Sequence, residues 1–397
     1  MTKKRKKKAV NVKNTIYTVF IVIIAVLVVA AGLKKQFFRS NPSSVKDYDS
    51  VSVDELKDLK VTFIDVGQGD GILVNFPDGK NMLIDFNKCD SSIVDKYLTQ
   101  NGEKITIDYL VATHPDQDHI GKLDYVYKNY EVKRSFRPYV LSENSSSSKF
   151  DSSFNCGTDI NQTSKTYYNY IESVYEYNKD SWEFFSDNSD FSCDVKLGAE
   201  TYTYTVDFVM PYATDLSGFS SFKTANNFSP MIMIEYAGRK ILLTGDAENT
   251  EGEKENTGAE YKFYEYYSNY NSEYVDCDVL KVGHHGSISS SALDFLKLVK
   301  PEYAVISCGV GNTYKHPAMK TINNLMTVQG GLSSGASKTG LFRTDLQGTV
   351  TLTVNSSGEM NFSVETHEND GYIFENGKTI YSIKDEINAN KEKARKS

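Results

Sequence analysis

The feature that most constrains this chain is the six-residue segment His114–His119, which reads His-Pro-Asp-Gln-Asp-His. It directly follows Ile107–Ala112, a largely apolar run that is typical of a buried strand. Four of its six side chains are of types that ligate metal ions. The chain has 6 histidines; two lie in this segment, and of the other four only His367 falls outside a recognisable motif. We therefore predict a metal site assembled around this segment.

The N-terminus differs in composition from the rest of the chain. Lys3–Lys8 is entirely basic, and Asn14–Leu33 then runs for 20 residues without a charge. As a helix rising about 1.5 Å per residue, this run would span a bilayer core of roughly 30 Å. More cations precede it than follow it, so we expect a single-pass anchor with a cytoplasmic N-terminus and an extracytoplasmic remainder. Two alternatives stay open: signal-peptidase cleavage near Val28–Ala30, and a buried core helix.

The net charge of -8 conceals an uneven distribution. Residues 1–39 hold ten basic side chains and no acidic one, so the remainder carries 34 basic against 52 acidic side chains. A surface this acidic argues against tight nonspecific binding of a polyanion, because neutralising phosphates requires basic side chains.

The 5 cysteines have no C-x-x-C spacing, which excludes a zinc ribbon. Cys277 and Cys308 lie in apolar runs and are predicted to be core residues. A disulfide between Cys156 and Cys193 is left open by the sequence.

Composition and apolar runs divide the chain into successive regions. We expect a basic cytoplasmic N-terminus over 1–13, a transmembrane signal anchor over 14–33, a tether over 34–59, a folded domain over 60–365 and a C-terminal extension over 366–397. Residues 142–163 are rich in Ser, Asn and Asp, and we predict a solvent-exposed insertion over about 142–197 with one helix at 167–177.

Within the folded domain, strand-like runs alternate with turns and helical patterns. Strands are predicted at 61–66, 71–76, 81–85, 107–112, 202–209, 231–236, 240–244, 278–282, 303–307, 348–354 and 360–365, and helices at 91–100, 292–299 and 316–325. This order is typical of a layered α/β fold. Asp246, His284-His285 and the segment His114–His119 all follow strands, so we expect them to converge on one pocket. A carboxylate such as Asp246 is able to bridge two divalent ions.

Several short motifs rich in Asp, His and Gly occur along residues 60–355. They are Asp65–Asp70, Leu83–Asp85, Thr113–Gly121, Leu243–Asp246, Lys281–Ser287 and Arg343–Asp345 with Gly348. Together they resemble the metallo-β-lactamase-fold hydrolases, and most closely the C-terminal extracellular domain of ComEC-type DNA-internalisation competence proteins. The resemblance implies an αββα sandwich with two divalent metal ions, Zn or Mn, at one edge.

The resemblance also assigns metal ligands residue by residue. The implied ligands are His114 and Asp116 for the first ion, Asp118, His119 and His285 for the second, with His284 as the less favoured alternative to His285, and Asp246 as the bridge between the two ions.

The first site departs from the broad superfamily. Asp116 stands where H-x-H-x-D-H enzymes have their second histidine, and no histidine lies between His119 and His284. ComEC-like relatives share this aspartate. A site so rich in oxygen ligands favours manganese or a weakly held zinc over a tight zinc pair.

Further residues are predicted to act in catalysis or to support the ligands. Asp118, His316 and His284 are predicted to be catalytic, with His316 as a proton donor or phosphate contact, or else a helix-start residue before Pro317. The remaining candidates are expected to support the site or shape its rim. They are Asp65, Asp70, Asp85, Asn227 and Ser229.

The predicted function is a membrane-anchored, extracytoplasmic, dinuclear metal-dependent hydrolase that acts through metal-activated water, with a phosphodiesterase or nuclease as the leading class. DNA or another phosphodiester is the expected partner besides the membrane, and the oligomeric state is left open. One alternative is a phosphocholine-type esterase or another small-molecule hydrolase of the cell envelope. The other is a noncatalytic binding module.

Overall fold

The computed structural model describes the folded part of the chain. The described residues are 47–142, 150, 153–158, 160, 164–184, 190–209, 222–328, 340–369, 372–375 and 378–382. The predicted anchor at 14–33 and the end of the C-terminal extension lie outside them. Within these described ranges, we find no helix with the length and apolar character needed to cross a bilayer.

Two eight-stranded sheets form the centre of the domain. In spatial order the first comprises β1 (Asp47–Ser52), β10 (Phe191–Leu197), β11 (Glu200–Phe208), β12 (Ile232–Tyr236), β13 (Arg239–Leu243), β14 (Val279–Lys281), β15 (Tyr303–Ile306) and β16 (Leu341–Arg343). The second comprises β18 (Met360–Val364), β17 (Val350–Val354), β2 (Leu59–Phe63), β3 (Gly71–Asn75), β4 (Asn81–Phe86), β7 (Ile107–Val111), β8 (Val132–Arg137) and β9 (Trp182–Phe184). Two short hairpins, β5 (Thr99–Gln100) with β6 (Glu103–Lys104) and β19 (Tyr372–Glu375) with β20 (Lys378–Ser382), lie apart from them.

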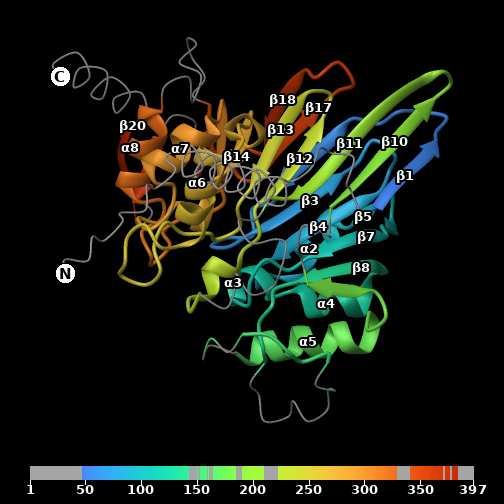
Figure 1. Ribbon diagram of the computed structural model, residues 1–397, viewed down its shortest axis with the longest axis horizontal. Helices are drawn as coiled ribbons and strands as arrows, with labels where there is room; N and C mark the ends of the chain where they lie inside the picture. The colour runs from blue at the N-terminus through green and yellow to red at the C-terminus, as the bar shows by residue number, and fades with distance from the viewer. Residues whose placement is uncertain are drawn as a thin grey trace, which may run out of the picture. The chain divides into compact units, whose positions relative to one another are not determined.

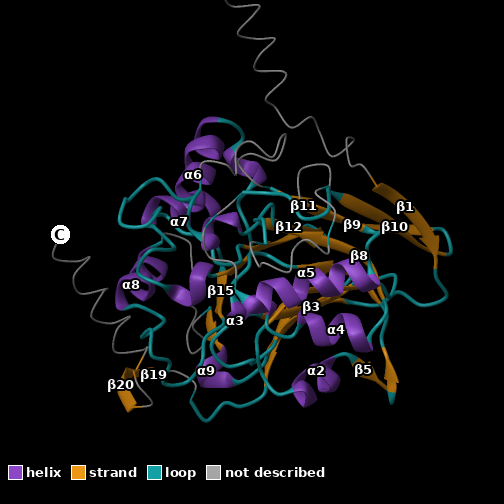
Figure 2. Ribbon diagram, turned by 90° about the horizontal axis from the view of Figure 1, so that it is seen from below, coloured by secondary structure: helices purple, strands orange, loops and turns teal. Residues whose placement is uncertain are grey.

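Helices cover the outer faces of the paired sheets (Figures 1 and 2). On one side lie α6 (Ala259–Asn269), α7 (Leu293–Val299) and α8 (Met319–Thr327), and on the other α2 (Ser91–Tyr97), α4 (Leu123–Asn129) and α5 (Lys165–Tyr177). Two further helices are single turns, α3 (Gln117–Ile120) and α9 (Thr344–Gln347). This is the αββα arrangement that the sequence predicted.

Local sequence explains why these elements form. Along β17 the side chains alternate between buried and partly exposed, as expected for a strand with one face in the core. The carboxylate of Asp90 accepts from the backbone N–H of Ser92 at the start of α2, and Ser164 caps α5 in the same way. The predicted hairpin around Ala237-Gly238 is confirmed as β12 and β13, with Tyr236 opposite Arg239.

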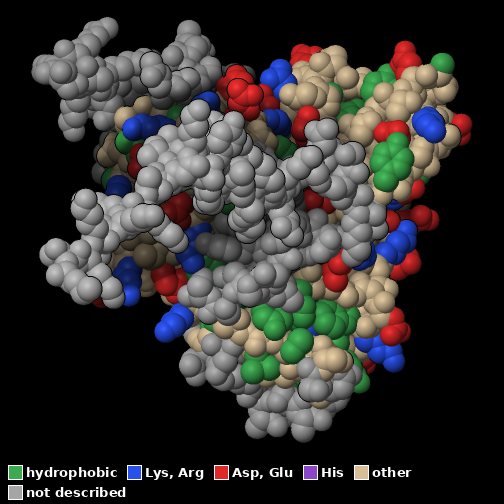
Figure 3. All heavy atoms as spheres, viewed as in Figure 1, with side chains coloured by type: hydrophobic (Ala, Val, Ile, Leu, Met, Phe, Trp, Pro, Cys, Tyr) green, Lys and Arg blue, Asp and Glu red, His purple; other side chains and the backbone are tan. Residues whose placement is uncertain are grey.

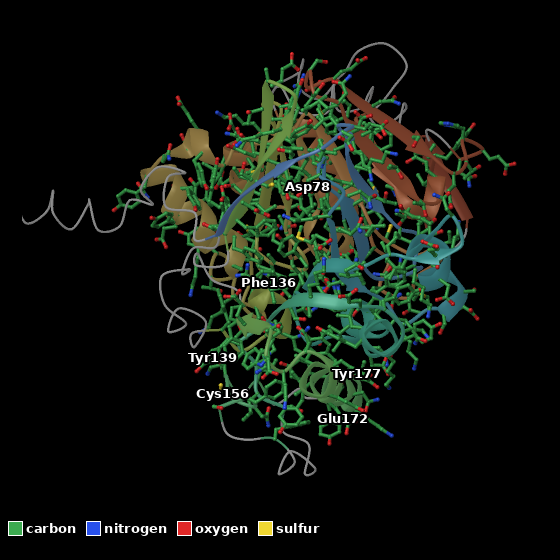
Figure 4. The ribbon with its side chains drawn as sticks, turned by 90° about the vertical axis from the view of Figure 1, so that its right-hand side faces the viewer. Asp78, Phe136, Tyr139, Cys156, Glu172 and Tyr177 are labelled. Carbon is green, nitrogen blue, oxygen red and sulfur yellow. The ribbon has the colours of Figure 1, made fainter. Side chains whose placement is uncertain are left out.

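Segments predicted as tether and insertion contribute to the sheets instead. β1, inside the predicted tether, pairs in parallel with β10. Within the predicted insertion, β9 extends the second sheet, and α5 buries Tyr167, Tyr170 and other side chains. The expectation of a wholly solvent-exposed insertion is therefore wrong for its described parts, because their aromatic side chains pack inward. Figure 4 views α5 nearly end-on, with Glu172 and Tyr177 at the helix and with Tyr139 and Cys156 to its left.

Other boundaries shift by a few residues. The predicted helix at 316–325 begins only at Met319, and the one at 91–100 ends at Tyr97. Cys277 and Cys308 are buried as predicted. Cys156 and Cys193 are both free, so no disulfide joins them in this structure.

Candidate metal centre

The predicted ligands come from the carboxyl ends of neighbouring parallel strands in both sheets. β7 leads to the segment His114–His119, β13 leads to Asp246, and β14 leads to the turn Gly283–Gly286 that carries His284 and His285. The carboxyl ends of parallel strands meet at one edge of a sheet. The two sheets together therefore bring residues more than 160 positions apart into one site.

Four of these side chains form a compact cluster. Asp118, His119, Asp246 and His285 each offer one ligand atom, and these atoms lie within 4.8 Å of one another. His119 Nε2 is 3.1 Å from Asp246 Oδ1, and His285 Nε2 is 3.2 Å from Asp246 Oδ2. His119, Asp246 and His285 are buried, whereas Asp118 is partly exposed. These four residues are the ones that the family resemblance assigns to the second ion and to the bridge between the ions.

Hydrogen bonds orient the two imidazoles of this cluster. His119 Nδ1 contacts Asp85 Oδ2 at 2.7 Å, and His285 Nδ1 contacts the backbone carbonyl of Ser307 at 2.8 Å. Both acceptors require a proton on Nδ1, which leaves each Nε2 to face the site. Asp85 is itself fixed, because its carboxylate accepts from both the backbone N–H and the hydroxyl of Thr113.

The two Nε2 atoms face each other at 3.2 Å. The two nitrogens can share one proton in a hydrogen bond, whereas two unprotonated nitrogens oppose their lone pairs and two protonated nitrogens oppose their N–H groups. A cation between the two nitrogens and the carboxylates removes this conflict, so the donor set fits a divalent metal ion.

The pKa shifts of His119 and His285 also indicate that this cluster favours a positive charge. Burial opposes protonation of His119, but Asp246 and Asp85 outweigh it and raise the pKa of His119 well above its usual range. Burial likewise opposes protonation of His285, and Asp246 and Asp118 raise its pKa well above the ordinary value. A bound dication would supply the charge that these protons otherwise provide.

A second group lies beside Asp246 Oδ2, the oxygen that His285 also approaches. His114 is buried, its Nε2 lacks a hydrogen-bond partner among the described residues, and this atom lies 3.7 Å from Asp116 Oδ2 and 4.0 Å from Asp246 Oδ2. Burial, followed by the charge of His119, lowers the pKa of His114 to about 3, which keeps its ring neutral. His284 Nε2 lies 3.8 Å from the same Asp246 oxygen. His114, Asp116 and Asp246 are therefore placed together as predicted, and His284 lies beside them rather than in the His285 position.

His284 and His316 border the ligand groups. The ring of His284 is held by Glu248, whose Oε1 lies 2.8 Å from His284 Nδ1 and also accepts a hydrogen bond from Ser289. The ring of His316 lies 5.3 Å from that of His284. Burial, with the charge of His284, lowers the pKa of His316 to about 4, so this imidazole is neutral near pH 7.

A buried ion pair behind the site escaped the sequence prediction. Lys281 is fully buried, and its ammonium group donates to Asp70 Oδ2 at 2.6 Å and to the carbonyl of Gly245 at 2.8 Å. It also lies 3.8 Å from Asp246 Oδ1. The signal in the sequence was a single lysine inside the apolar run Val279–Val282. Because a buried lysine requires a partner, this lysine was the one signal from which a nearby carboxylate could have been inferred.

The remaining supporting candidates have structural contacts. Asn227 Oδ1 accepts from the backbone N–H groups of Glu248 and Ala259, and Ser229 Oγ accepts from that of Asp246. Asp65 accepts from the N–H of Gly67 in a turn. These residues hold the loops that carry the ligands.

Comparisons with known proteins agree with a metallo-β-lactamase-like fold. The model of the metallo-β-lactamase superfamily matches residues 218–310, which include Asp246, His284 and His285. The crystal structure of the metallo-β-lactamase fold protein YhfI from Bacillus subtilis has a TM-score of 0.37 at 12% identity, over 77% of this chain and 100% of that one. The described domain has a metallo-β-lactamase-like α/β fold.

Two relatives indicate a narrower class of protein within this fold. ComE operon protein 3 of Bacillus subtilis (strain 168) is 28% identical over 287 residues, covering 67% of this chain and 30% of that protein. Competence protein ComA of Neisseria gonorrhoeae is 35% identical over 133 residues, covering 34% of this chain and 16% of that protein. The chain is therefore similar to ComEC-type competence proteins and contains a stretch that matches the metallo-β-lactamase superfamily. It spans less than a third of either relative's length.

Binding of a metal ion is expected to release protons. Because His119 and His285 hold protons near neutral pH, a dication has to displace them, so affinity for Mn²⁺ should rise from pH 6 to pH 8. Calorimetric titration of the chelator-treated full chain in detergent, repeated in buffers of different ionisation enthalpy, measures the protons released. The exposed residue His367 provides the control, since His367→Ala should leave that number unchanged. Metal binding without proton release would contradict the prediction.

Proposed function

We propose that this protein is a divalent-metal-dependent phosphodiesterase, with nuclease activity as its leading form. The observation that carries the proposal is the opposed pair of imidazole nitrogens, His119 Nε2 and His285 Nε2, between the carboxylates of Asp118 and Asp246. Such an arrangement fits a cation, and the second group at His114 and Asp116 makes room for another. Manganese or a weakly held zinc suits these oxygen-rich surroundings.

When bound, divalent metal ions activate water for attack and neutralise the charge that develops on a phosphoryl centre. The chain's own residues set up the conditions for this chemistry. Asp85 orients His119, and the carbonyl of Ser307 orients His285. Glu248 holds His284 with its Nε2 toward Asp246, where it is positioned to contact a substrate oxygen.

The proposed location is extracytoplasmic, with the domain attached to the membrane by a helix at 14–33. The uncharged run of 20 residues and the excess of cations before it support this part of the proposal. Similarity to competence proteins supports DNA as the polymer.

A second candidate is hydrolysis of a small phosphate ester of the cell envelope. The acidic composition of residues 40–397 favours it, because a small substrate needs no extended basic surface. On the face shown in Figure 3, acidic and basic side chains lie interspersed.

The full chain in detergent, supplied with Mn²⁺ or Zn²⁺, should hydrolyse single-stranded DNA, RNA or bis-p-nitrophenyl phosphate. Asp118→Ala should abolish this activity, because Asp118 belongs to the ligand cluster. Hydrolysis of the small diester alone would remove the nuclease proposal and favour the second candidate. Equal rates in wild type and Asp118→Ala would refute catalysis at this site.

A further inference from the structure

Exposed apolar side chains gather in the loops beside the metal centre. Among the described residues, Ile288 follows the His284-His285 turn and is 63% exposed, while Val310 and Tyr314, in the loop after β15, are 66% and 69% exposed. Single exposed apolar residues are ordinary on a protein surface. Three such residues in the two loops next to one site are a feature that the chemistry of the ligands does not require.

Tyr314 differs from the other two because its ring continues a column of rings into the site. Its ring lies 5.7 Å from that of His316, with the planes inclined by 29°. The ring of His316 in turn lies 6.3 Å from that of His285, inclined by 27°. The column therefore runs from a ligand candidate at the metal centre to an aromatic ring at the surface.

The loop that carries Tyr314 is fixed at both ends. The side chain of Asn312 accepts from the backbone N–H of His316 at 2.9 Å, and it donates to the carbonyl of Gly309 at 2.9 Å. Gln68 Oε1 accepts from the N–H of Gly309 at 3.1 Å. A Cβ on Gly309 would lie 2.6 Å from the backbone nitrogen of Gln68, so only glycine allows this close approach. Tyr314 is thus an exposed ring on a preorganised loop.

We propose that Tyr314 is a stacking platform for an unpaired nucleobase of the strand that is cleaved. This inference rests on the proposed nuclease function and names its substrate class as single-stranded nucleic acid. A base on the outer face of Tyr314 extends the ring column, so that the strand continues along the column toward the carboxylate–histidine cluster. Bases inside a duplex are already paired and stacked, so they are not free to occupy this position.

The charge of the protein favours a stacking contact. The net charge is -8, so phosphate contacts alone provide little affinity. Stacking on an aromatic ring is tolerant of base identity and needs no positive charge. Tyrosine suits this role because it offers a large rigid surface at a low cost in side-chain entropy. The exposed Lys315, next to Tyr314, adds one cation near the expected backbone.

The test compares Tyr314→Ala, Tyr314→Trp and the matched control Tyr177→Ala in the full chain with Mn²⁺ present. Tyr177 is also exposed, at 47%, but lies at the end of α5. Removing one base–aromatic stack should raise the KM for a single-stranded oligonucleotide about 5-fold to 100-fold. The kcat should change little, because Tyr314 touches no reacting atom. Tyr314→Trp should retain the wild-type KM, as should Tyr177→Ala.

Two further measurements separate this inference from the proposed function. On an oligomer of abasic phosphodiester units, wild type and Tyr314→Ala should have the same KM, because no base is present to stack. Binding of a 2-aminopurine-labelled single strand, monitored by quenching in the Asp118→Ala background, should weaken on adding Tyr314→Ala. A strand that is bound in this way but never cleaved would refute the nuclease function and leave the stacking role intact. A single strand that wild type does not bind, or binds equally well without Tyr314, would overturn the inference.

Discussion

Asp246→Asn is expected to remove bound metal and to lower phosphodiester hydrolysis by more than about a thousandfold. Asp246 is buried and lies between the two ligand groups, with His119 near Oδ1 and with His285, His114 and His284 near Oδ2. An amide keeps the shape of the side chain and loses the charge. Metal content per chain, measured by emission spectroscopy, and the rate with bis-p-nitrophenyl phosphate report the two effects separately.

Glu235→Gln is the matched control for this experiment. Glu235 is an exposed carboxylate on β12, in the same sheet as the strand that leads to Asp246. The control should keep the metal content and the rate of wild type. Retention of two metal ions and normal activity by Asp246→Asn would contradict the bridging role.

Lys281→Met is expected to lower the free energy of unfolding by about 3–5 kcal/mol, the usual loss when one partner of a buried ion pair is removed. Burial opposes ionisation of Asp70, but Lys281 outweighs it, and the pKa of Asp70 falls to about 2. Without Lys281, the carboxylates of Asp70 and Asp246 lose their nearest buried ammonium group. Denaturant unfolding at pH 7 in the presence of chelator measures the loss.

Two variants test the interpretation. Adding Asp70→Asn to Lys281→Met should restore a large part of the stability, because the unpaired charge disappears with its partner. Lys240→Met removes a lysine from the adjacent strand whose ion pair with Asp276 is partly exposed, and it should cost no more than about 1 kcal/mol. If Lys281→Met unfolds like Lys240→Met, the buried pair does not contribute as described.

Local pattern was sufficient for much of the fold. The hairpin of β12 and β13 was predictable because two apolar runs flank Ala237-Gly238, a signal contained in a few residues. A helix at 167–177 was also predicted, and α5 occupies this stretch. Its burial was not predicted, because its polar flanking sequence resembles an exposed loop.

The strand β1 shows the limit of this approach. Asp47–Ser52 is short and polar, and it becomes a strand by pairing in parallel with β10, whose register sets Asp47 opposite Phe191. A partner so distant in sequence is not encoded in the composition of either segment. Propensity therefore gave a tether where tertiary pairing produces a sheet edge.

For the site, the sequence by itself determined the donor types and their placement after strands. The segment His114–His119, Asp246 and the pair His284-His285 were identifiable because metal ligands are few in kind and strand ends are readable from apolar runs. The oxygen-rich character of the site follows from Asp116 and from the lack of a histidine between His119 and His284.

Only the tertiary structure decided which of these donors lie together in each ligand group. His284 and His285 are adjacent, yet both have positive φ, at 46° and 52°, and the turn sends His285 into the cluster with His119 and His284 toward Glu248. The ion pair of Lys281 with Asp70 likewise joins segments that are distant in the chain. The ring column that ends at Tyr314 depends on the geometry of its loop. Such contacts depend on backbone direction and packing, which residue identity along the chain does not fix.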